Sequence, residues 1–530
     1  MAPRLIVLGW DSATFDVVDE LAVAGRLPAL SGLLDRGFRA GLRSTWPPMT
    51  DSAWTSAFTG RNPGGHGIFG SWYRAPGAYA CRYFSSRDRI APALWEMTDD
   101  VRFLVWNVPM TFPPESVEGA MVSGYGAPPG SRFCSPGDFQ DELARRWPLD
   151  DLLDRAPHGS LKAFLDDLIR GAKAQGEALP WAAEHVGADV VTAVWPHIDR
   201  AQHFFWRFRG TDHPLADAVD RVHEAIDAAT AAVVEAFPEA DVMVVSDHGA
   251  GPLLGDVNVG AWLAGTGRAS YAKKKRPRLA DAAWALPPSV RRLGRRVSPA
   301  LARKAMGARL AGQLAPFEWS ETQAFLGFHS DLWLNLRGRE PDGRVTPAEA
   351  PAVLDELASE LGELTDPRTG ARVFANVHRR DDIYSGAAVD LAPDLMLDSW
   401  SAGYRVAPGR EASEVVIPPA PLAGVDESWS SDHRPVGIFV GAGPRIAHGS
   451  TDELNLFDVC PTALALLGKP VPSDLDGAPA EAAMDPNFLA AHPVTVEGAT
   501  TTRTADPGSP FSDDEAEAVA SHLKDLGYIE

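Results

Sequence analysis

The sequence RLIVLGWDSATFD at residues 4–16 decides the fold class. It is a short run of β-branched and apolar residues that ends in a carboxylate and is followed by helical periodicity. Buried strands that alternate with helices are typical of a parallel sheet covered by helices. Similar apolar runs recur at residues 101–108, 189–195, 241–246 and 436–440. We therefore predict an α/β fold with a mostly parallel sheet flanked by helices.

The composition indicates a globular protein. Of the 530 residues, 45% are hydrophobic and 23% charged. The formal net charge of −22 argues against binding of nucleic-acid polymers, because such a field repels a polyanion. Three cysteines, none in a CxxC pair, favour a reducing compartment. The apolar start is too short for a signal peptide and no run approaches a membrane span, so we expect a cytoplasmic protein.

One segment reverses the charge of the chain. Between residues 268 and 309 there are 13 Lys or Arg and a single acid, Asp281. We predict a basic helical cap or insertion at residues 251–314, which either offsets the acidic remainder or contacts an anionic surface. Residues 1–250 and 315–480 are then one discontinuous domain. A linker at 481–510 and a C-terminal docking helix at 511–530 complete the predicted organisation.

Candidate metal ligands lie next to the predicted strands, where open α/β sheets gather their ligands. They are Asp11, Asp199, His203, Asp247, His248 and His433. Each of these residues taken alone is more often structural. Three carboxylates and three imidazoles at one sheet edge, however, are difficult to bury without a cation. Imidazole and carboxylate together suit Zn²⁺ or Mn²⁺, and each ion takes three or four ligands, so the set predicts two divalent ions.

Residues 44–54, STWPPMTDSAW, supply a hydroxyl group for this site. Thr50 follows two prolines and a methionine, where a helix can begin, so its hydroxyl would lie at a positive helix end beside a metal. Both effects lower the pKa of the hydroxyl and make Thr50 a candidate nucleophile. A helix N-cap is the commoner use of such a threonine, and the two roles are compatible.

These motifs together resemble the alkaline phosphatase superfamily, in its bacterial type I phosphodiesterase/nucleotide pyrophosphatase branch. The resemblance rests on Asp11 after the first strand and on PPMT, TGRNPGGHGIF, DRAQHFFW, SDHG, DHRPVGIF and DVCPTALALLGKPVPSDLDG. It runs over about residues 4–250 and 315–480. It implies an alkaline-phosphatase-like core with an inserted cap.

The resemblance also implies roles for the site residues. One ion would be held by Asp199, His203 and His433, and the other by Asp11, Asp247, His248 and the Thr50 oxygen. The implied reaction is hydrolysis of a phosphodiester or pyrophosphate, in which Thr50 attacks phosphorus and water then hydrolyses the phosphothreonine. Phosphomonoesterases and phosphomutases use the same metal site and stay as alternatives, as does a non-catalytic binding protein on this fold.

Two glycine-rich segments supply candidate contacts for a small phosphorylated substrate, nucleotide-like or other. Arg61, Asn62 and His66 lie in GRNPGGHG, although a turn with incidental polar residues is an equal alternative. Tyr125 lies in GYGAPPG at residues 124–130, where glycine and proline fix a loop over the site. The nearby aromatic residues, Trp54 among them, either stack on a base or pack in the core.

Overall fold

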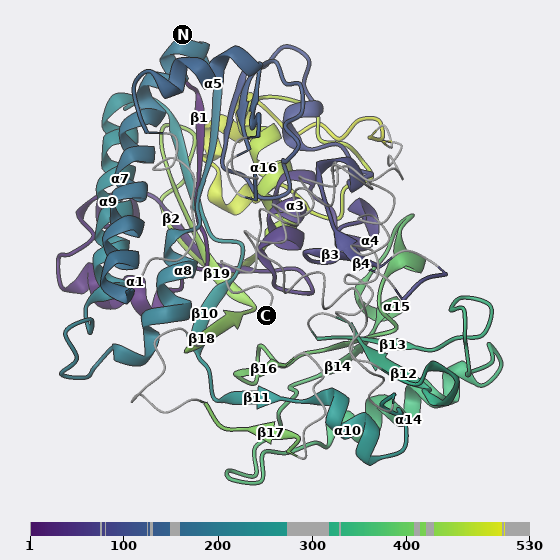
Figure 1. Cartoon of the computed structure of the whole chain (residues 1–530). Coiled ribbons are helices and arrows are strands. Elements are labelled where there is room, and N and C mark those ends of the chain that lie inside the picture. The colour runs from purple at the N-terminus through teal and green to yellow at the C-terminus, as the bar shows by residue number, and fades with distance from the viewer. Residues whose placement is uncertain are drawn as a thin grey trace, which may run out of the picture.

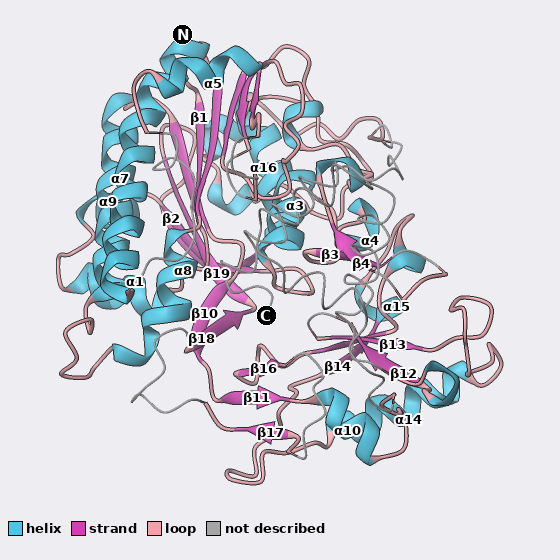
Figure 2. Ribbon diagram, viewed as in Figure 1, coloured by secondary structure: helices cyan, strands magenta, loops and turns pink. Residues whose placement is uncertain are grey.

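The computed structural model describes residues 2–503 apart from 75–76, 80, 124–125, 128–130, 149–159, 273–316, 328–329, 408–413, 420–428 and 501–502. A large lobe is built on one sheet covered by helices, and a smaller lobe of short strands lies beside it (Figure 1). Figure 2 shows the long strands of the large lobe running side by side, with one end pointing toward the smaller lobe.

The main sheet has nine strands among the described residues, in the order β20-β2-β19-β9-β1-β8-β5-β6-β7. The strands are β1 (Leu5–Trp10), β2 (Phe38–Arg43), β5 (Phe103–Trp106), β6 (Gly119–Val122), β7 (Cys134–Ser135), β8 (Val190–Trp195), β9 (Asp241–Val245), β19 (Val436–Ala442) and β20 (Gly449–Asn455). At its centre β1 pairs in parallel with both β8 and β9, while β19 runs antiparallel between β9 and β2. The predicted α/β fold with a mostly parallel sheet is confirmed.

Helices cover both faces of this sheet. One face carries α1 (Phe15–Val23), α2 (Pro28–Arg36), α7 (Leu161–Val186) and α9 (Ala218–Ala236), and the other carries α3 (Thr50–Thr59) and α16 (Val459–Leu466). Alternate residues of β1 feed the two cores: Ile6 and Leu8 pack on the α7 side, and Val7 packs on the α3 side. A strand buried on both faces must be apolar throughout, which explains the run LIVLGW.

The remaining helices and strands of the large lobe are short. They are α4 (Pro63–His66), the hairpin β3 (Trp72–Arg74) and β4 (Cys81–Tyr83), α5 (Gly137–Ala144), α8 (His197–Phe205) and α17 (Pro486–Ala491). The Asp485 carboxylate caps α17 by accepting from two backbone N–H groups, so the predicted linker contains a helix. The predicted docking helix at 511–530 lies outside the described residues.

The described residues of the smaller lobe form two small sheets. One holds β11 (Gly255–Val257), β16 (Tyr404–Val406) and β17 (Val416–Ile417), and the other holds β12 (Ala324–Leu326), β13 (Asp331–Leu334), β14 (Val377–Arg379) and β15 (Leu395–Leu397). The helices among its described residues are α10 (Val259–Gly265), α14 (Ala350–Gly362) and α15 (Arg380–Ile383). The lobe is joined to the core through β10 (Gly249–Pro252) and β18 (Ser431–Arg434), which pair antiparallel.

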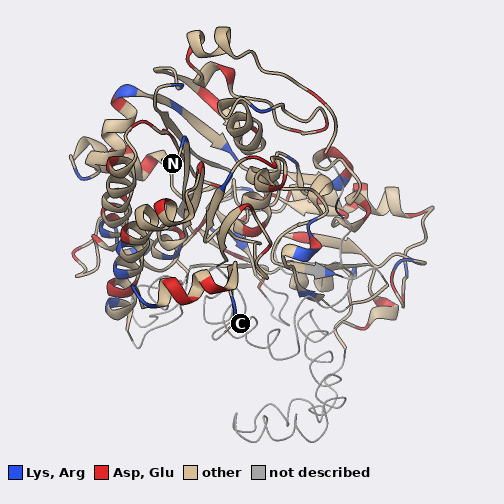
Figure 3. Ribbon diagram, turned by 90° about the horizontal axis from the view of Figure 1, so that it is seen from above, with Lys and Arg blue, Asp and Glu red and all other residues tan. Residues whose placement is uncertain are grey.

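The smaller lobe extends beyond the insertion predicted at residues 251–314. Residues up to about 430 also belong to it, because their strands pair with one another rather than with the main sheet. Most of the basic segment lies at 273–316, outside the described residues. Asp and Glu residues are spread over many elements of both lobes (Figure 3). No described helix has the length and apolar character needed to cross a membrane.

Candidate metal centre

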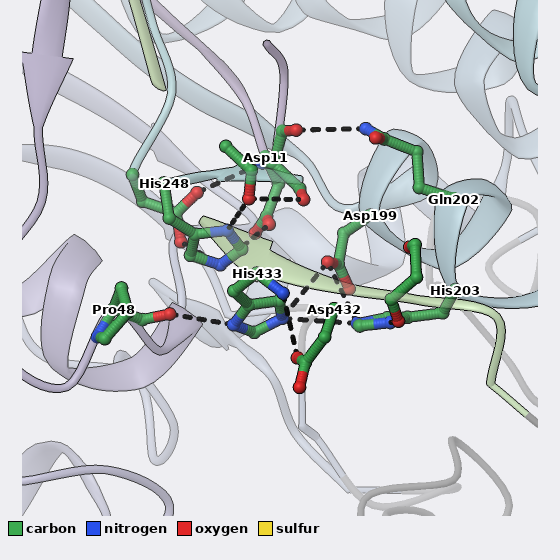
Figure 4. Close-up of polar contacts among 12 residues, drawn as sticks. Asp11, Pro48, Asp199, Gln202, His203, His248, Asp432 and His433 are labelled. Carbon is green, nitrogen blue, oxygen red and sulfur yellow. Dashed lines mark hydrogen bonds and ion pairs between the residues drawn. The ribbon is translucent and has the colours of Figure 1, made fainter. Parts of the chain in front are cut away.

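Four neighbouring strands bring the predicted ligands to one edge of the main sheet. β1, β8 and β9 are parallel, so their carboxyl ends meet there, and antiparallel β19 begins at the same edge. Asp11 follows β1, Asp199 and His203 lie on α8 after β8, Asp247 and His248 follow β9, and His433 lies in β18 just before β19. The structure brings all six together in one buried cluster, and Figure 4 labels each of them except Asp247, which contacts His248.

The first group of ligands surrounds Asp199. The Nε2 atoms of His203 and His433 lie 3.2 and 3.4 Å from Asp199 Oδ1, and 3.2 Å from each other. Asp199 and His203 share one face of α8 through their i, i+4 spacing, as predicted. Their donor atoms, with that of His433, all lie within 4.8 Å of one another.

The second group surrounds His248. Its Nε2 lies 3.1 Å from Asp247 Oδ2 and 3.9 Å from Asp11 Oδ1. The His248 ring also stacks on the His433 ring with 3.8 Å between centroids, which makes the two groups contiguous. Asp11, Asp199 and His248 form a second set of donor atoms within 4.8 Å of one another. Asp199 therefore belongs to both sets, whereas the resemblance places it in one.

Backbone carbonyls orient the three imidazole rings. Each ring donates its Nδ1 proton to a carbonyl oxygen, those of Ser431, Gly249 and Pro48 for His203, His248 and His433, at 3.0, 3.1 and 2.7 Å. In a neutral imidazole the other nitrogen then carries a lone pair. The three Nε2 atoms are directed to carboxylate oxygens, so that either a proton or a metal cation between them satisfies both partners.

Several buried polar atoms of the cluster have no hydrogen-bond partner within the described part of the chain. They are Asp11 Oδ1, Thr50 Oγ1, Asp247 Oδ2 and His248 Nε2. Buried polar atoms in native proteins ordinarily have a hydrogen-bond partner, so this group of unpaired atoms indicates that the site binds a further partner. Oxygen and imidazole nitrogen are ligands for Zn²⁺ and Mn²⁺, and the donor set therefore fits two divalent ions.

The charges of the cluster lead to the same conclusion. Burial raises the pKa of Asp11 well above its usual range, and the charges of Asp247 and Asp199 raise it further. Burial also raises the pKa of Asp247 and lowers that of His248. Burial opposes ionisation of Asp199, yet His203 and His433 hold its pKa well below the usual value. Burial alone would lower the pKa of His433, but its hydrogen bond with Asp199 and the charge of that carboxylate raise it to about 9. Divalent ions would supply this positive charge instead, and the imidazoles could then bind them in the neutral form.

Trp54, a residue of α3, positions Asp11. Its indole Nε1 donates to Asp11 Oδ2 at 2.9 Å, which leaves Oδ1 directed to His248. The Trp54 side chain is fully buried in the core between α3 and the main sheet, so packing is its role and the base-stacking alternative does not apply. The indole fits because Gly9 has no side chain: a Cβ there would lie 2.5 Å from the Trp54 ring and 2.8 Å from Val194.

Gly9→Ala should therefore destabilise the protein and disturb Asp11. Overpacking of this kind costs about 1–3 kcal/mol of the free energy of unfolding. Chemical denaturation with Gly362→Ala as the matched control measures it, since a Cβ at Gly362, the last residue of α14, meets nothing within 4 Å. Equal stability of the two variants would show that Trp54 can move away without cost.

Thr50 is the first residue of α3 and not its N-cap. Met49 occupies the N-cap position and no side chain caps the helix, so the Thr50 hydroxyl is not used for capping. The segment is fixed on both sides of Thr50, because the Pro48 carbonyl accepts from His433 and Trp54 donates to Asp11. The hydroxyl thus lies at the positive end of a ten-residue helix, on a segment tied to both ligand groups.

The three loop candidates for substrate contact have partners in the scaffold. Arg61 pairs with Asp474, Asn62 donates to Asp476 and Ser385, and His66 bonds to Ser56 and accepts from the Ile68 N–H. The Asn62 side chain also caps α4. These contacts are those of a structural turn, the alternative that the sequence left open. Tyr125 lies outside the described residues.

The chain matches the sequence family described as type I phosphodiesterase / nucleotide pyrophosphatase over residues 5–415. The chain belongs to this family. It is thus a type I phosphodiesterase family hydrolase, and the buried Asp and His groups are consistent with a two-metal site. No match was found among curated proteins.

Solved structures of distantly similar proteins share the fold of this type I phosphodiesterase family member. Murine ectonucleotide pyrophosphatase/phosphodiesterase 5, as an inactive threonine-to-alanine variant with AMP, has a TM-score of 0.51 at 10% identity, covering 91% of this chain and 100% of its own. Phosphonoacetate hydrolase from Sinorhizobium meliloti 1021 with phosphonoformate has 0.52 at 15%, covering 86% and 94%. A variant of alkaline phosphatase PafA has 0.53 at 14%, covering 92% and 99%. The predicted alkaline-phosphatase-like core is confirmed.

Proposed function

We propose that this protein hydrolyses a phosphodiester or pyrophosphate bond of a small substrate, with Thr50 as nucleophile and two divalent ions, Zn²⁺ or Mn²⁺, as cofactors. The observation that carries the proposal is the pair of contiguous donor groups that share Asp199. The Thr50 hydroxyl is buried, does not cap α3 and has no hydrogen-bond partner among the described residues. It lies on the segment that contacts both donor groups, which supports its role as nucleophile.

The chain's residues perform two displacements at phosphorus. Thr50 Oγ1 bonds to phosphorus as the bond to the leaving oxygen breaks, and the leaving group departs with a proton. A water oxygen then bonds to phosphorus, the Thr50 oxygen leaves and recovers a proton, and the phosphoryl product is released. The ions lower the pKa of hydroxyl groups and neutralise phosphoryl charge when bound. The N-terminus of α3 adds backbone N–H groups that favour the anion.

A substrate panel tests this proposal with purified protein loaded with Zn²⁺ or Mn²⁺. The panel holds aryl phosphomonoesters and diesters, nucleotide diesters and sugars, and lipid headgroup esters; the AMP and phosphonoformate complexes of the solved relatives justify adding nucleotides and phosphonates. We expect diester cleavage that a chelator abolishes and that exceeds monoester cleavage. Full metal occupancy without turnover of any diester, or faster monoester cleavage, would overturn the proposal.

Asp51 supplies a prediction about this preference. It is a buried residue that directly follows Thr50 in the chain. Burial raises the pKa of its carboxyl group to about 6, although a hydrogen bond with Ser71 lowers it in part. Ionised Asp51 is within roughly 10 Å of a phosphoryl group on Thr50, where like charges repel by about 1–2 kcal/mol at an effective dielectric constant of about 20. A monoester dianion suffers this repulsion more than a diester.

Asp51→Asn should therefore raise the ratio of monoester to diester kcat/KM about fivefold or more, the factor that about 1 kcal/mol gives. The ratio is measured at pH 8 with p-nitrophenyl phosphate and its bis ester. Asp19→Asn, which removes a half-exposed carboxylate paired with Arg39, is the charge-matched control. An unchanged ratio in Asp51→Asn would show that this charge does not reach the substrate.

A further inference from the structure

The residues just before His433, which lies on strand β18, enclose His203, a candidate ligand on helix α8. The Ser430 N–H and hydroxyl both donate to the His203 carbonyl oxygen, at 2.7 and 3.0 Å. The Ser431 carbonyl accepts from His203 Nδ1 at 3.0 Å. One short segment, residues 429–433, therefore carries one ligand of the first group and holds both the backbone and the ring of another.

Trp429 completes this enclosure. Its half-buried ring lies on the face of the His203 imidazole, with 3.7 Å between centroids and 22° between planes. The His433 ring is a second neighbour of the His203 imidazole, with 5.1 Å between centroids and 40° between planes. An imidazole stacked in this way cannot rotate about its Cβ–Cγ bond without losing the contact. The stack thus keeps Nε2 directed to Asp199.

The smaller lobe supports Trp429 in turn. Arg405, on β16, lies with its Cζ 5.4 Å from the centre of the Trp429 ring. Arg405 is itself fixed by Asp256 of β11 through two hydrogen bonds of 2.8 and 3.0 Å. A continuous series of contacts therefore leads from the β11–β16 sheet through Trp429 to His203. Neither Trp429 nor Arg405 is a candidate ligand.

We propose that Trp429 is a positioning residue that holds the His203 imidazole for metal binding and so raises affinity selectively at the Asp199, His203 and His433 group. The proposal rests on the two-metal function above. Two physical effects act together. A pre-oriented imidazole loses less rotational freedom when it ligates. A metal-bound imidazole also gains positive charge, which the face of an indole stabilises better than a phenyl ring or an aliphatic side chain does.

The test is competition of the full-length protein with a chelator for Zn²⁺, with the metal content measured for each variant. Wild type should bind two Zn²⁺ ions. Trp429→Ala should bind one of them about tenfold more weakly, the scale of groups that orient metal ligands. Trp429→Phe, which keeps an aromatic ring and serves if the alanine variant does not fold, should fall between wild type and Trp429→Leu. Loss of affinity at both sites alike, or none at either, would overturn the proposal.

A double-mutant cycle shows whether the effect passes through His203. In a His203→Ala background, Trp429→Ala should change Zn²⁺ affinity less than about twofold, because coupling is lost when its partner is absent. Trp181→Ala is the matched control, since it removes a tryptophan stacked on His185, which is not a candidate ligand. An undiminished effect in the His203→Ala background would refute the positioning role, whereas fewer than two ions in wild type would refute the proposed function.

Discussion

Thr50→Ala should lower phosphodiester turnover at least about 10³-fold, the scale seen when a covalent nucleophile is removed. Metal content should stay close to wild type, since the buried cluster keeps all six of its carboxylate and imidazole ligands. Elemental analysis and initial rates on one preparation measure both quantities. Thr50→Ser keeps the oxygen and loses only a methyl group, so we expect it to retain measurable activity.

Acid quenching of wild-type turnover should also trap a phosphoryl adduct on the peptide that contains Thr50. Ser52 and Thr55 are the controls for this assignment, because their hydroxyls already donate to backbone carbonyls, Ser52 to Pro47 and Met49 and Thr55 to Asp51. An adduct on either residue, or near wild-type turnover in Thr50→Ala, would make direct attack by water the better mechanism.

Asp199→Ala should remove both metal ions, whereas His203→Ala should weaken one of them. The difference follows from the position of Asp199 in both donor sets, while His203 belongs to one. Divalent ions supply several kcal/mol of stabilisation to a phosphoryl transition state, so we expect turnover of Asp199→Ala to fall about 10³-fold or more. Equilibrium dialysis followed by elemental analysis measures the stoichiometry of each variant.

Asp432→Asn is the matched control for this prediction. Asp432 is buried beside His433 and accepts from its backbone N–H, but it belongs to neither donor set. The amide keeps an oxygen that can accept the same bond, so the variant should hold two ions. Retention of one ion by Asp199→Ala would assign that residue to a single site, as the resemblance implies.

The ligand cluster was predictable because strand ends are visible in the sequence. Asp11 and Asp247 each end an apolar run, and parallel strands bring such ends to one edge. The shared position of Asp199 was not predictable, because it depends on how α8 leaves β8 in three dimensions. The hydrogen bonds that orient the imidazoles could not be predicted either, because their acceptors are backbone carbonyl groups, which every residue has.

Residues whose roles depend on distant contacts could not be assigned from sequence. From the sequence, Trp54 could either stack on a base or pack in the core, and its burial and its hydrogen bond to Asp11 decide between these roles. His66 lies in a glycine-rich loop typical of a phosphate contact, yet its two ring nitrogens are committed to Ser56 and to a backbone N–H. The only indication of a role for Trp429 in the sequence is its position four residues before His433. Its contact with His203 of α8 became visible only in the structure.

The pairing of β10 with β18 closes a long excursion of the chain at the edge of the core. Pro252 lies opposite Ser431, and Ala250 lies opposite His433, so the chain leaves and re-enters the core at neighbouring points. Everything from 253 to 430 is topologically one insertion between β9 and β19. A change of length confined to this insertion leaves the β10–β18 pairing in place, and with it the positions of His248 and His433 at its base. The positions of these two candidate ligands are therefore independent of how much chain lies between the paired strands.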